Sequence, residues 1–309
     1  MAGKITVALL SGGDSPEREV SLKSGDQVYE ALDKGRYNVI RYDPKTDLNR
    51  LVEDSGKIDV ALVILHGPFG EDGTIQGLLD LLHIPYQGSG VLGSALAMNK
   101  IFSKKLYADS KIPTPQHTVL GKGERLDPEG IFRRLGRPVV IKPVCCGSSV
   151  GMSIADEADR LIEGAVNAWV HDRTIMIEEY IDGVEITVGV IGNDMLEALP
   201  VIEIIPDKSR AFFDYEAKYT PGVTQEICPA RIALHLTEKA QALGIAAHRA
   251  LCCRGYSRSD MILRDQEIFV LETNTIPGMT ATSLLPLAAR TAGISFSRLL
   301  DRLIGLALE

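Results

Sequence analysis

Near the C-terminal end of the sequence, residues 258–274 read RSDMILRDQEIFVLETN. The two apolar runs in this stretch predict two neighbouring strands, joined by a turn centred near Gln266. Such a turn would place Asp260 directly across from Glu272. The stretch therefore predicts a pair of strands that brings two carboxylates together.

Two further polar residues extend this arrangement by one step along each strand. Because side chains at positions i and i+2 point to the same face of a sheet, Arg258 and Asn274 would share the face of Asp260 and Glu272. Oxygen ligands on an open face suit Mg²⁺, which keeps several waters and takes its other ligands from substrate phosphates. We expect Asp260, Glu272 and Asn274 to hold two Mg²⁺ ions, or Mn²⁺ in their place. The alternative is a solvated strand face with charge pairs.

The N-terminal third of the chain alternates strands with helices. Apolar runs at residues 5–10, 39–42 and 59–65 predict strands, and residues 17–32 and 74–82 predict helices. This alternation indicates a parallel sheet, whose ligands lie beyond the carboxyl ends of its strands. His66 follows one of these strand ends, where it could contact substrate or fill a structural role.

The turn after the first strand excludes one common cofactor. Residues 11–16 read SGGDSP, whereas a dinucleotide-binding turn needs the pattern GxGxxG. We therefore exclude nicotinamide binding there.

The middle of the chain contains a candidate phosphate loop. Residues 138–143 predict a strand that carries Lys142, and residues 144–151 read VCCGSSVG. Backbone N–H groups of such a Gly/Ser loop can bind an anion, although the pattern is not a Walker A motif. Lys100 is a weaker phosphate-binding candidate, and Lys218 lies in a long irregular stretch at 206–223. Cys145 and Cys146 have no identifiable activating base beside them, so a catalytic thiol is not predicted.

An apolar strand at residues 174–178 ends in acidic residues. The sequence continues with Glu178, Glu179, Tyr180 and Ile181, and Glu185 follows shortly afterwards. Such a strand end can bind adenine through its backbone and ribose through a carboxylate. An ordinary strand end with exposed acids is the alternative.

Composition and charge limit the class of protein. The chain has 309 residues, of which 45% are hydrophobic and 24% charged. That length corresponds to about two domains, or three small ones. The net charge of −8 argues against a nucleic-acid partner. Five cysteines in two adjacent pairs and a single fit neither a disulfide framework nor a CxxC metal site, which favours a reduced, cytoplasmic protein. No apolar run is long enough to span a bilayer, and we identify no signal peptide.

Together these motifs resemble the D-alanine–D-alanine ligase family, whose members are ATP-grasp enzymes of peptidoglycan precursor synthesis. The resemblance covers nearly the whole chain and rests on residues 12–21 (GGDSPEREVS), 66–73 (HGPFGEDG), 142–151 (KPVCCGSSVG), 215–219 (YEAKY), 258–260 (RSD) and 272–284 (ETNTIPGMTATSL). It implies an α/β (α+β) ATP-grasp fold with an N-terminal Rossmann-like parallel βαβ domain. The implied domains are residues 1–96, 97–183 and 184–309.

The resemblance also implies a two-step reaction and a role for each candidate residue. The carboxylate of one D-alanine attacks the γ-phosphate of ATP, and the amine of a second D-alanine then attacks the resulting acyl phosphate. The implied ATP-binding residues are Lys100, Lys142, Ser148, Ser149, Glu178, Glu179, Tyr180, Ile181, Glu185 and Lys218. The implied catalytic residues are Glu17, Ser148, Tyr219, Arg258 and Gly278. The implied substrate-binding residues are Glu17, His66, Ser283 and Leu284.

Within the implied set, Glu17, Ser148 and Tyr219 would form a hydrogen-bonded triad that holds the long loop closed. Arg258 and the Gly278 N–H would stabilise the oxyanion. A homodimer is implied by the resemblance alone, with ATP and D-alanine as small-molecule partners and no nucleic acid or membrane.

Two alternative functions stay open, and the chain departs from the family pattern at two places. A ligase that joins D-alanine to a hydroxy acid would lack the loop tyrosine found at Tyr219. A non-catalytic relative would be expected to have lost the metal ligands or Arg258. The chain has Cys145 and Cys146 where the family often has Arg-Glu, and it has Glu179 where the family often has lysine.

Overall fold

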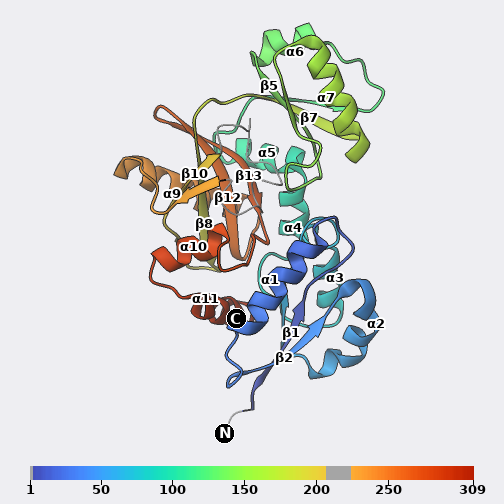
Figure 1. The fold of residues 1–309 in the computed structure, drawn as a ribbon, viewed down its shortest axis with the longest axis vertical. Helices are drawn as coiled ribbons and strands as arrows, with labels where there is room; N and C mark the ends of the chain where they lie inside the picture. The colour runs from blue at the N-terminus through green and yellow to red at the C-terminus, as the bar shows by residue number, and fades with distance from the viewer. Residues whose placement is uncertain (1–2, 207–223) are drawn as a thin grey trace.

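A computed structural model of the chain describes residues 3–206 and 224–309, which form three β-sheets with flanking helices (Figure 1). The predicted mixed α/β architecture is confirmed, with one parallel sheet and two antiparallel ones. The predictions for Lys218 and Tyr219 fall outside the described residues.

The N-terminal sheet is parallel, as the alternation of strands and helices predicts, and its strand order is β2-β1-β3. Its strands are β1 (Ile5–Leu10), β2 (Tyr37–Tyr42) and β3 (Val60–Val63). Its helices are α1 (Arg18–Ala31), α2 (Pro44–Asp54), the 3₁₀ helix η1 (Ser55–Lys57) and α3 (Thr74–Leu81). Helix α2 is not among the predicted elements, although Asp43 caps it and Pro44 begins it.

The second sheet is antiparallel and has the order β4-β7-β5-β6. Its strands are β4 (His117–Gly121), β5 (Val139–Pro143), β6 (Ser153–Ala155) and β7 (Thr174–Glu179). The helices in this part of the chain are α4 (Val91–Met98), α5 (Lys100–Asp109), α6 (Pro128–Leu135) and α7 (Ala158–His171). Asn99 separates α4 from α5, and its side chain caps α5 by accepting from the backbone N–H groups of Ile101 and Phe102.

The third sheet is built around β8 and β12, in the order β11-β10-β8-β12-β13, with β9 paired to β8. Its strands are β8 (Val184–Gly192), β9 (Glu197–Ala198), β10 (Ile202–Pro206), β11 (Thr224–Ile227), β12 (Gly255–Arg264) and β13 (Glu267–Asn274). Its helices are α9 (Leu234–Ala250), α10 (Leu284–Thr291) and α11 (Phe296–Ala307). β9 and β10 are two separate strands, because Pro200 lies between them and has no backbone N–H for a sheet ladder.

The β12–β13 hairpin has the register predicted from the sequence. Asp260 pairs with Glu272 and Arg258 pairs with Asn274. The register shifts next to Asp260, because Met261 pairs with Val270 and the intervening Leu271 has no Cα partner. This β-bulge turns Glu272 to the polar face, where strict alternation from the buried Val270 would have pointed it into the core.

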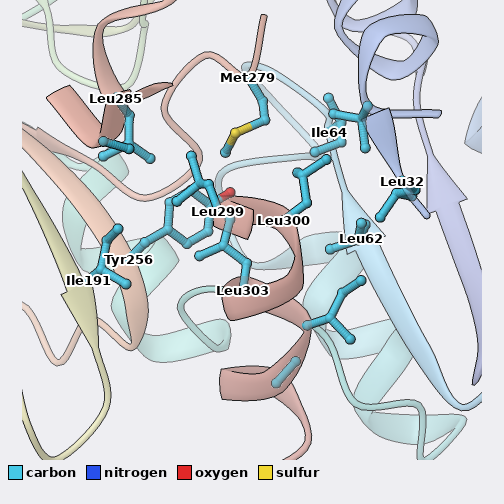
Figure 2. Close-up of a cluster of buried hydrophobic side chains, with 14 of the residues drawn as sticks. Leu32, Leu62, Ile64, Ile191, Tyr256, Met279, Leu285, Leu299, Leu300 and Leu303 are labelled. Carbon is cyan, nitrogen blue, oxygen red and sulfur yellow. The ribbon is translucent and has the colours of Figure 1, made fainter. Parts of the chain in front are cut away.

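The N-terminal and C-terminal parts of the chain share one hydrophobic core. Leu62 of the parallel sheet belongs to the same buried cluster as Tyr256 of β12 and Leu299, Leu300 and Leu303 of α11 (Figure 2). Helix α11 lies between the two parts and contacts both α1 and β12. This arrangement fixes the ends of β1 and β3 relative to the β12–β13 hairpin.

The four-stranded sheet has a separate core. Its buried cluster draws only on residues from 131 to 177, with Leu161 and Ala165 of α7 packed against Val139 and Ile141 of β5. The site described below lies between this part and the shared core.

Candidate active site

A cleft separates the four-stranded sheet from the six-stranded sheet. Lys100, Lys142, Gly147 and Ser149 line it on one side, and Glu185, Asp260 and Glu272 line it on the other. Of the described residues predicted for adenosine, Glu185 lines this cleft, whereas residues 178–181 are not part of its lining. The cleft therefore combines a basic side with an acidic side.

Lys100 of α5 and Lys142 of β5 line the cleft, and Lys104 of α5 lies behind it. Lys100 Nζ donates to the Cys146 carbonyl at 2.8 Å and lies 3.4 Å from Glu272 Oε2. Lys104 and Lys142 both form ion pairs with Glu178 of β7. Since Lys100 and Lys104 are four residues apart, they lie on the same side of α5.

Glu178 is buried, and its carboxylate points at lysines rather than into the cleft. Burial alone would raise its pKa, but the ammonium groups of Lys104 and Lys142 outweigh burial and hold the pKa at about 2. Burial lowers the pKa of Lys104 to about 8, against the opposing effect of Glu178. Glu178 is therefore an anion that organises two lysines.

The other residues predicted for adenosine surround the end of β7. A carboxylate oxygen of Glu179 accepts the backbone N–H of Gln116 at 3.0 Å, and Glu179 donates its own N–H to the Gln116 carbonyl at 2.9 Å. Ile181 is buried, and Tyr180 is partly exposed. Burial raises the pKa of the Tyr180 hydroxyl.

The polar face of the β12–β13 hairpin forms the acidic side. Asp260 accepts from Arg258 Nε at 2.9 Å and Nη2 at 2.8 Å, from Thr187 Oγ1 at 2.7 Å and from Asn274 Nδ2 at 3.2 Å. Because Asn274 donates through its nitrogen, its amide oxygen is oriented away from that bond. The donor set of two carboxylates and one amide oxygen fits Mg²⁺.

This donor set is small. Among residues 3–206 and 224–309, no three or more His, Cys, Asp or Glu side chains are clustered in a way that could hold a metal ion. Magnesium commonly keeps waters and substrate phosphates in its shell, so a face with two carboxylates is sufficient for it.

A second, polar pocket of about 350 Å³ adjoins the cleft at Gly147. The predicted residues that line it are Glu17, His66, Ser148, Arg258, Gly278, Ser283 and Leu284. Glu17 precedes α1, and Ser148 Oγ donates to Glu17 Oε1 across the pocket. Ser148 and Ser149 both have left-handed backbone conformations, with φ of 50° and 58°, which tightens the loop.

Two glycines bring backbone close to the polar pocket. A Cβ atom at Gly67, whose φ is +70°, would lie 2.8 Å from Glu17 Oε2. A Cβ atom at Gly278 would lie 2.9 Å from Ser283 Oγ. Both positions therefore require glycine to keep neighbouring polar side chains in place.

His66 and Glu71 form the wall beside Glu17. His66 is only 5% exposed, and burial lowers its pKa. Glu71 Oε2 accepts the Gly67 N–H at 2.7 Å. Burial, assisted by the negative charge of Glu17, raises the Glu71 pKa to about 8.

Sequence reasoning missed three charged residues of the site. Glu71 lies within the recognised stretch 66–73, and Lys104 follows Lys100 at helical spacing, so both had a signal. Glu226 of β11 lines the polar pocket, and burial raises its pKa. No motif in the sequence distinguishes Glu226.

Comparisons with known proteins cover almost the whole chain. Residues 43–89 match the family model described as "D-ala D-ala ligase N-terminus", and residues 106–305 match "D-ala D-ala ligase C-terminus". The chain is 63% identical to a D-alanine–D-alanine ligase of Syntrophobacter fumaroxidans over 99% of this chain and 98% of the relative. It is 52% identical to the corresponding ligase of Desulfotalea psychrophila over 100% of this chain and 96% of the relative.

A solved structure gives the same result. The D-alanine–D-alanine ligase of Bacillus anthracis in complex with ATP superimposes with a TM-score of 0.86 at 36% identity, covering 98% of this chain and 97% of that one. Separately, none of the helices described here has the length and apolar character needed to cross a membrane.

Proposed function

This chain belongs to the D-alanine–D-alanine ligase family and has its ATP-grasp fold, and on that premise we propose that it joins two D-alanine molecules into D-alanyl-D-alanine. ATP is the second substrate and is converted to ADP and phosphate. The product serves peptidoglycan precursor synthesis. The observation that carries this proposal is that the cleft, which has a basic side and an acidic side, adjoins the polar pocket at Gly147.

In the first step, a carboxylate oxygen of one D-alanine forms a bond to the γ-phosphorus of ATP while the bond to ADP breaks. Glu17 binds the ammonium group of this D-alanine, and His66 contacts the same substrate. The hydrogen bond from Ser148 to Glu17 supports this assignment, because it fixes the carboxylate at the pocket wall. Tyr219 would complete the triad.

In the second step, the amine of another D-alanine attacks the acyl carbon, phosphate leaves, and the amine loses a proton. Arg258 and the Gly278 N–H stabilise the oxyanion. Ser283 and the N–H of Leu284 receive the carboxylate of the second D-alanine. The start of helix α10 at Leu284 supports this role, since backbone N–H groups at a helix N-terminus bind anions.

The nucleotide lies in the cleft. Lys100, Lys142, Ser149 and Lys218 contact phosphates, and Glu185 binds the ribose. Residues 178–181 approach the adenine. Those whose side chains already have partners in the protein contact the adenine through their backbone.

Asp260, Glu272 and Asn274 would hold two Mg²⁺ ions, or Mn²⁺. Their oxygen donors on one sheet face support this proposal. Ions bound there would supply positive charge that neutralises the phosphates of ATP.

We also propose that residues 1–96, 97–183 and 184–309 act as three domains of a cytoplasmic homodimer. Exposed apolar side chains on α3, α4 and α5 support the dimer, among them Leu81, Leu92 and Phe102. Sedimentation of the wild type as a dimer, and of Leu92→Arg as a monomer, would agree with this proposal.

A product assay tests the function. With ATP, Mg²⁺ and D-alanine, phosphate release should require D-alanine and should match the D-alanyl-D-alanine measured by chromatography. D-Lactate in place of the second D-alanine should give little depsipeptide. Absence of dipeptide from a folded, ATP-binding chain would refute the proposal.

The metal face has its own test, Glu272→Gln. Turnover should fall by at least about a hundredfold with the melting temperature nearly unchanged, because the lost interaction acts mainly in the transition state. Near-normal turnover at saturating Mg²⁺ would exclude the two-ion assignment.

A further inference from the structure

Lys104 is a buried cation that none of the roles above uses. Its side chain is 0% exposed, although lysine is among the residues least often buried. Its Nζ lies 2.7 Å from Glu178 Oε1 and donates to Thr114 Oγ1 at 2.6 Å. A buried lysine with this geometry needs its carboxylate partner, because an isolated buried charge is strongly disfavoured.

Glu178 divides its two oxygens between two lysines. Oε1 faces Lys104, and Oε2 faces Lys142, which lines the nucleotide cleft. The carboxylate therefore does not belong to Lys142 alone. Lys104 takes up part of the negative charge that would otherwise act on the cleft lysine.

The charges around the cleft show why this division matters. Lys104 and Lys142 share the carboxylate of Glu178, and Lys100 pairs with Glu272. His117 of β4, the strand paired with β7, is half-buried, and burial lowers its pKa. Without Lys104, the carboxylate of Glu178 would be balanced by Lys142 alone.

We propose that Lys104 is a positioning residue of the nucleotide site, which holds Glu178 so that the ammonium group of Lys142 can bind the phosphates of ATP. This inference rests on the proposed function for the identity of the ligand. Lys104 itself contacts Glu178 and Thr114 from behind the cleft and acts on ATP through Lys142.

The physical consequence of removing Lys104 follows from Glu178. With one partner gone, Glu178 is balanced by Lys142 alone, and the two groups neutralise each other. The ammonium group of Lys142 is then held by Glu178 and is less available to phosphates in the cleft. A change in how one carboxylate is shared between two lysines, acting over several ångströms near a protein surface, is enough to change binding by about tenfold. Nucleotide affinity should fall, whereas D-alanine binding in the adjoining pocket should not.

The test compares Lys104→Met with Lys105→Met. Lys105 is the next residue on α5 but is exposed, so its variant is the matched control. Binding of ADP with Mg²⁺ is measured by calorimetry, below the unfolding transition of each variant. KM for ATP, KM for D-alanine and kcat are measured alongside. We expect K104M to weaken ADP binding and to raise KM for ATP by about tenfold, while KM for D-alanine changes by less than about twofold.

Glu178→Gln and the double variant K104M/E178Q complete a double-mutant cycle. If K104M alone does not fold, the comparison of these two variants still tests the proposal. When residue 178 is neutral, Lys104 has no carboxylate to hold. The double variant should then bind ADP within about twofold of E178Q. An equal loss of affinity in both backgrounds would mean that Lys104 acts by its own charge, and would overturn the proposal. So would K104M binding ADP as tightly as K105M does.

This experiment separates the inference from the proposed function. ADP binding does not require ligation, so a chain that binds nucleotide but forms no dipeptide refutes the function alone. A wild type that ligates D-alanine, with K104M unaffected in nucleotide binding, refutes the inference alone.

Discussion

His248 is a buried histidine on α9, far from any role in the reaction. Its Nδ1 lies 2.7 Å from Ser257 Oγ, and its Nε2 has no hydrogen-bond partner in the described structure. Burial, with a smaller contribution from Arg249, lowers its pKa to about 4. The folded state therefore requires neutral His248, whereas the unfolded chain protonates it near pH 6.5.

The pH dependence of stability follows from this difference. The contribution of His248 is fully present above pH 6.5 and is lost as the pH falls towards 4, by up to about 3 kcal/mol. Urea unfolding from pH 8 to pH 4.5 should show this loss. His248→Gln should flatten that part of the curve, whereas the exposed His83→Gln should leave it unchanged. Parallel curves for wild type and His248→Gln would contradict the assignment.

Cys146 lines the cleft, and its thiol gives a second prediction at the scale of one residue. Burial raises its pKa, and burial also raises that of Cys145. Maleimide labelling should therefore be slow at pH 7 and accelerate as the pH rises. ATP with Mg²⁺ should protect Cys146, while the exposed Cys252 should label regardless of nucleotide.

The double variant Cys145→Ser/Cys146→Ser checks that these thiols are not catalytic. It should keep its turnover and lose most of its sensitivity to maleimide. A folded but inactive double variant would assign a chemical role to one of the thiols.

Between elements, α5 is tied to the β12–β13 hairpin by a buried chain of hydroxyl groups. Tyr107 Oη lies 2.7 Å from Thr273 Oγ1, which lies 2.8 Å from Ser259 Oγ. Tyr107→Phe should lower the free energy of unfolding by about 1–2 kcal/mol in urea. Adding Thr273→Val should cost less than the two single changes together. Additive losses would mean that the chain of hydroxyls is not a coupled unit.

The same hairpin shows how much of the fold the local sequence predicts. Its register was predictable because Asp260 and Glu272 flank one turn, yet the actual turn is at Asp265 and Gln266, with Leu271 bulged to restore the pairing. A bulge has no clear signature in the sequence, since it depends on the sheet around it. By contrast, strands with continuous apolar runs, such as β3, were predictable because their signal lies within the strand itself.

The candidate site was only partly predictable. Motifs identified Lys142 and Glu178, but the pattern of residues cannot show that Glu178 faces two lysines instead of the adenine. That orientation depends on the ion pair between Lys104 of α5 and Glu178 of β7, which is a contact between residues far apart in the sequence. Glu226 was missed because only the packing of β11 brings it to the pocket.

For the whole molecule, the shared core and the core of the four-stranded sheet predict two levels of stability. Leu161→Ala lies in the core confined to the four-stranded part, and Leu299→Ala lies in the shared core. Each should cost about 2–5 kcal/mol. Hydrogen exchange should show faster opening only around β5, β7 and α7 for the first variant. The second should accelerate exchange in β1, β3 and β12 together.

Uniform acceleration in both variants would show that the molecule opens as one unit. A molecule with separate openings can instead move its four-stranded part, together with the loop that carries Gly147 and Ser148, over the cleft. Closure around nucleotide then needs no rearrangement of the shared core.

The shared core also determines the order in which parts of the chain can fold during synthesis on the ribosome. The parallel sheet emerges first, but Leu62 and its neighbours are covered by α11, which is translated long afterwards. Until α11 is translated, one face of the parallel sheet keeps its apolar residues exposed. Exposed apolar surface is the condition under which nascent chains aggregate. The four-stranded part, whose core comes from contiguous sequence, can fold while translation continues.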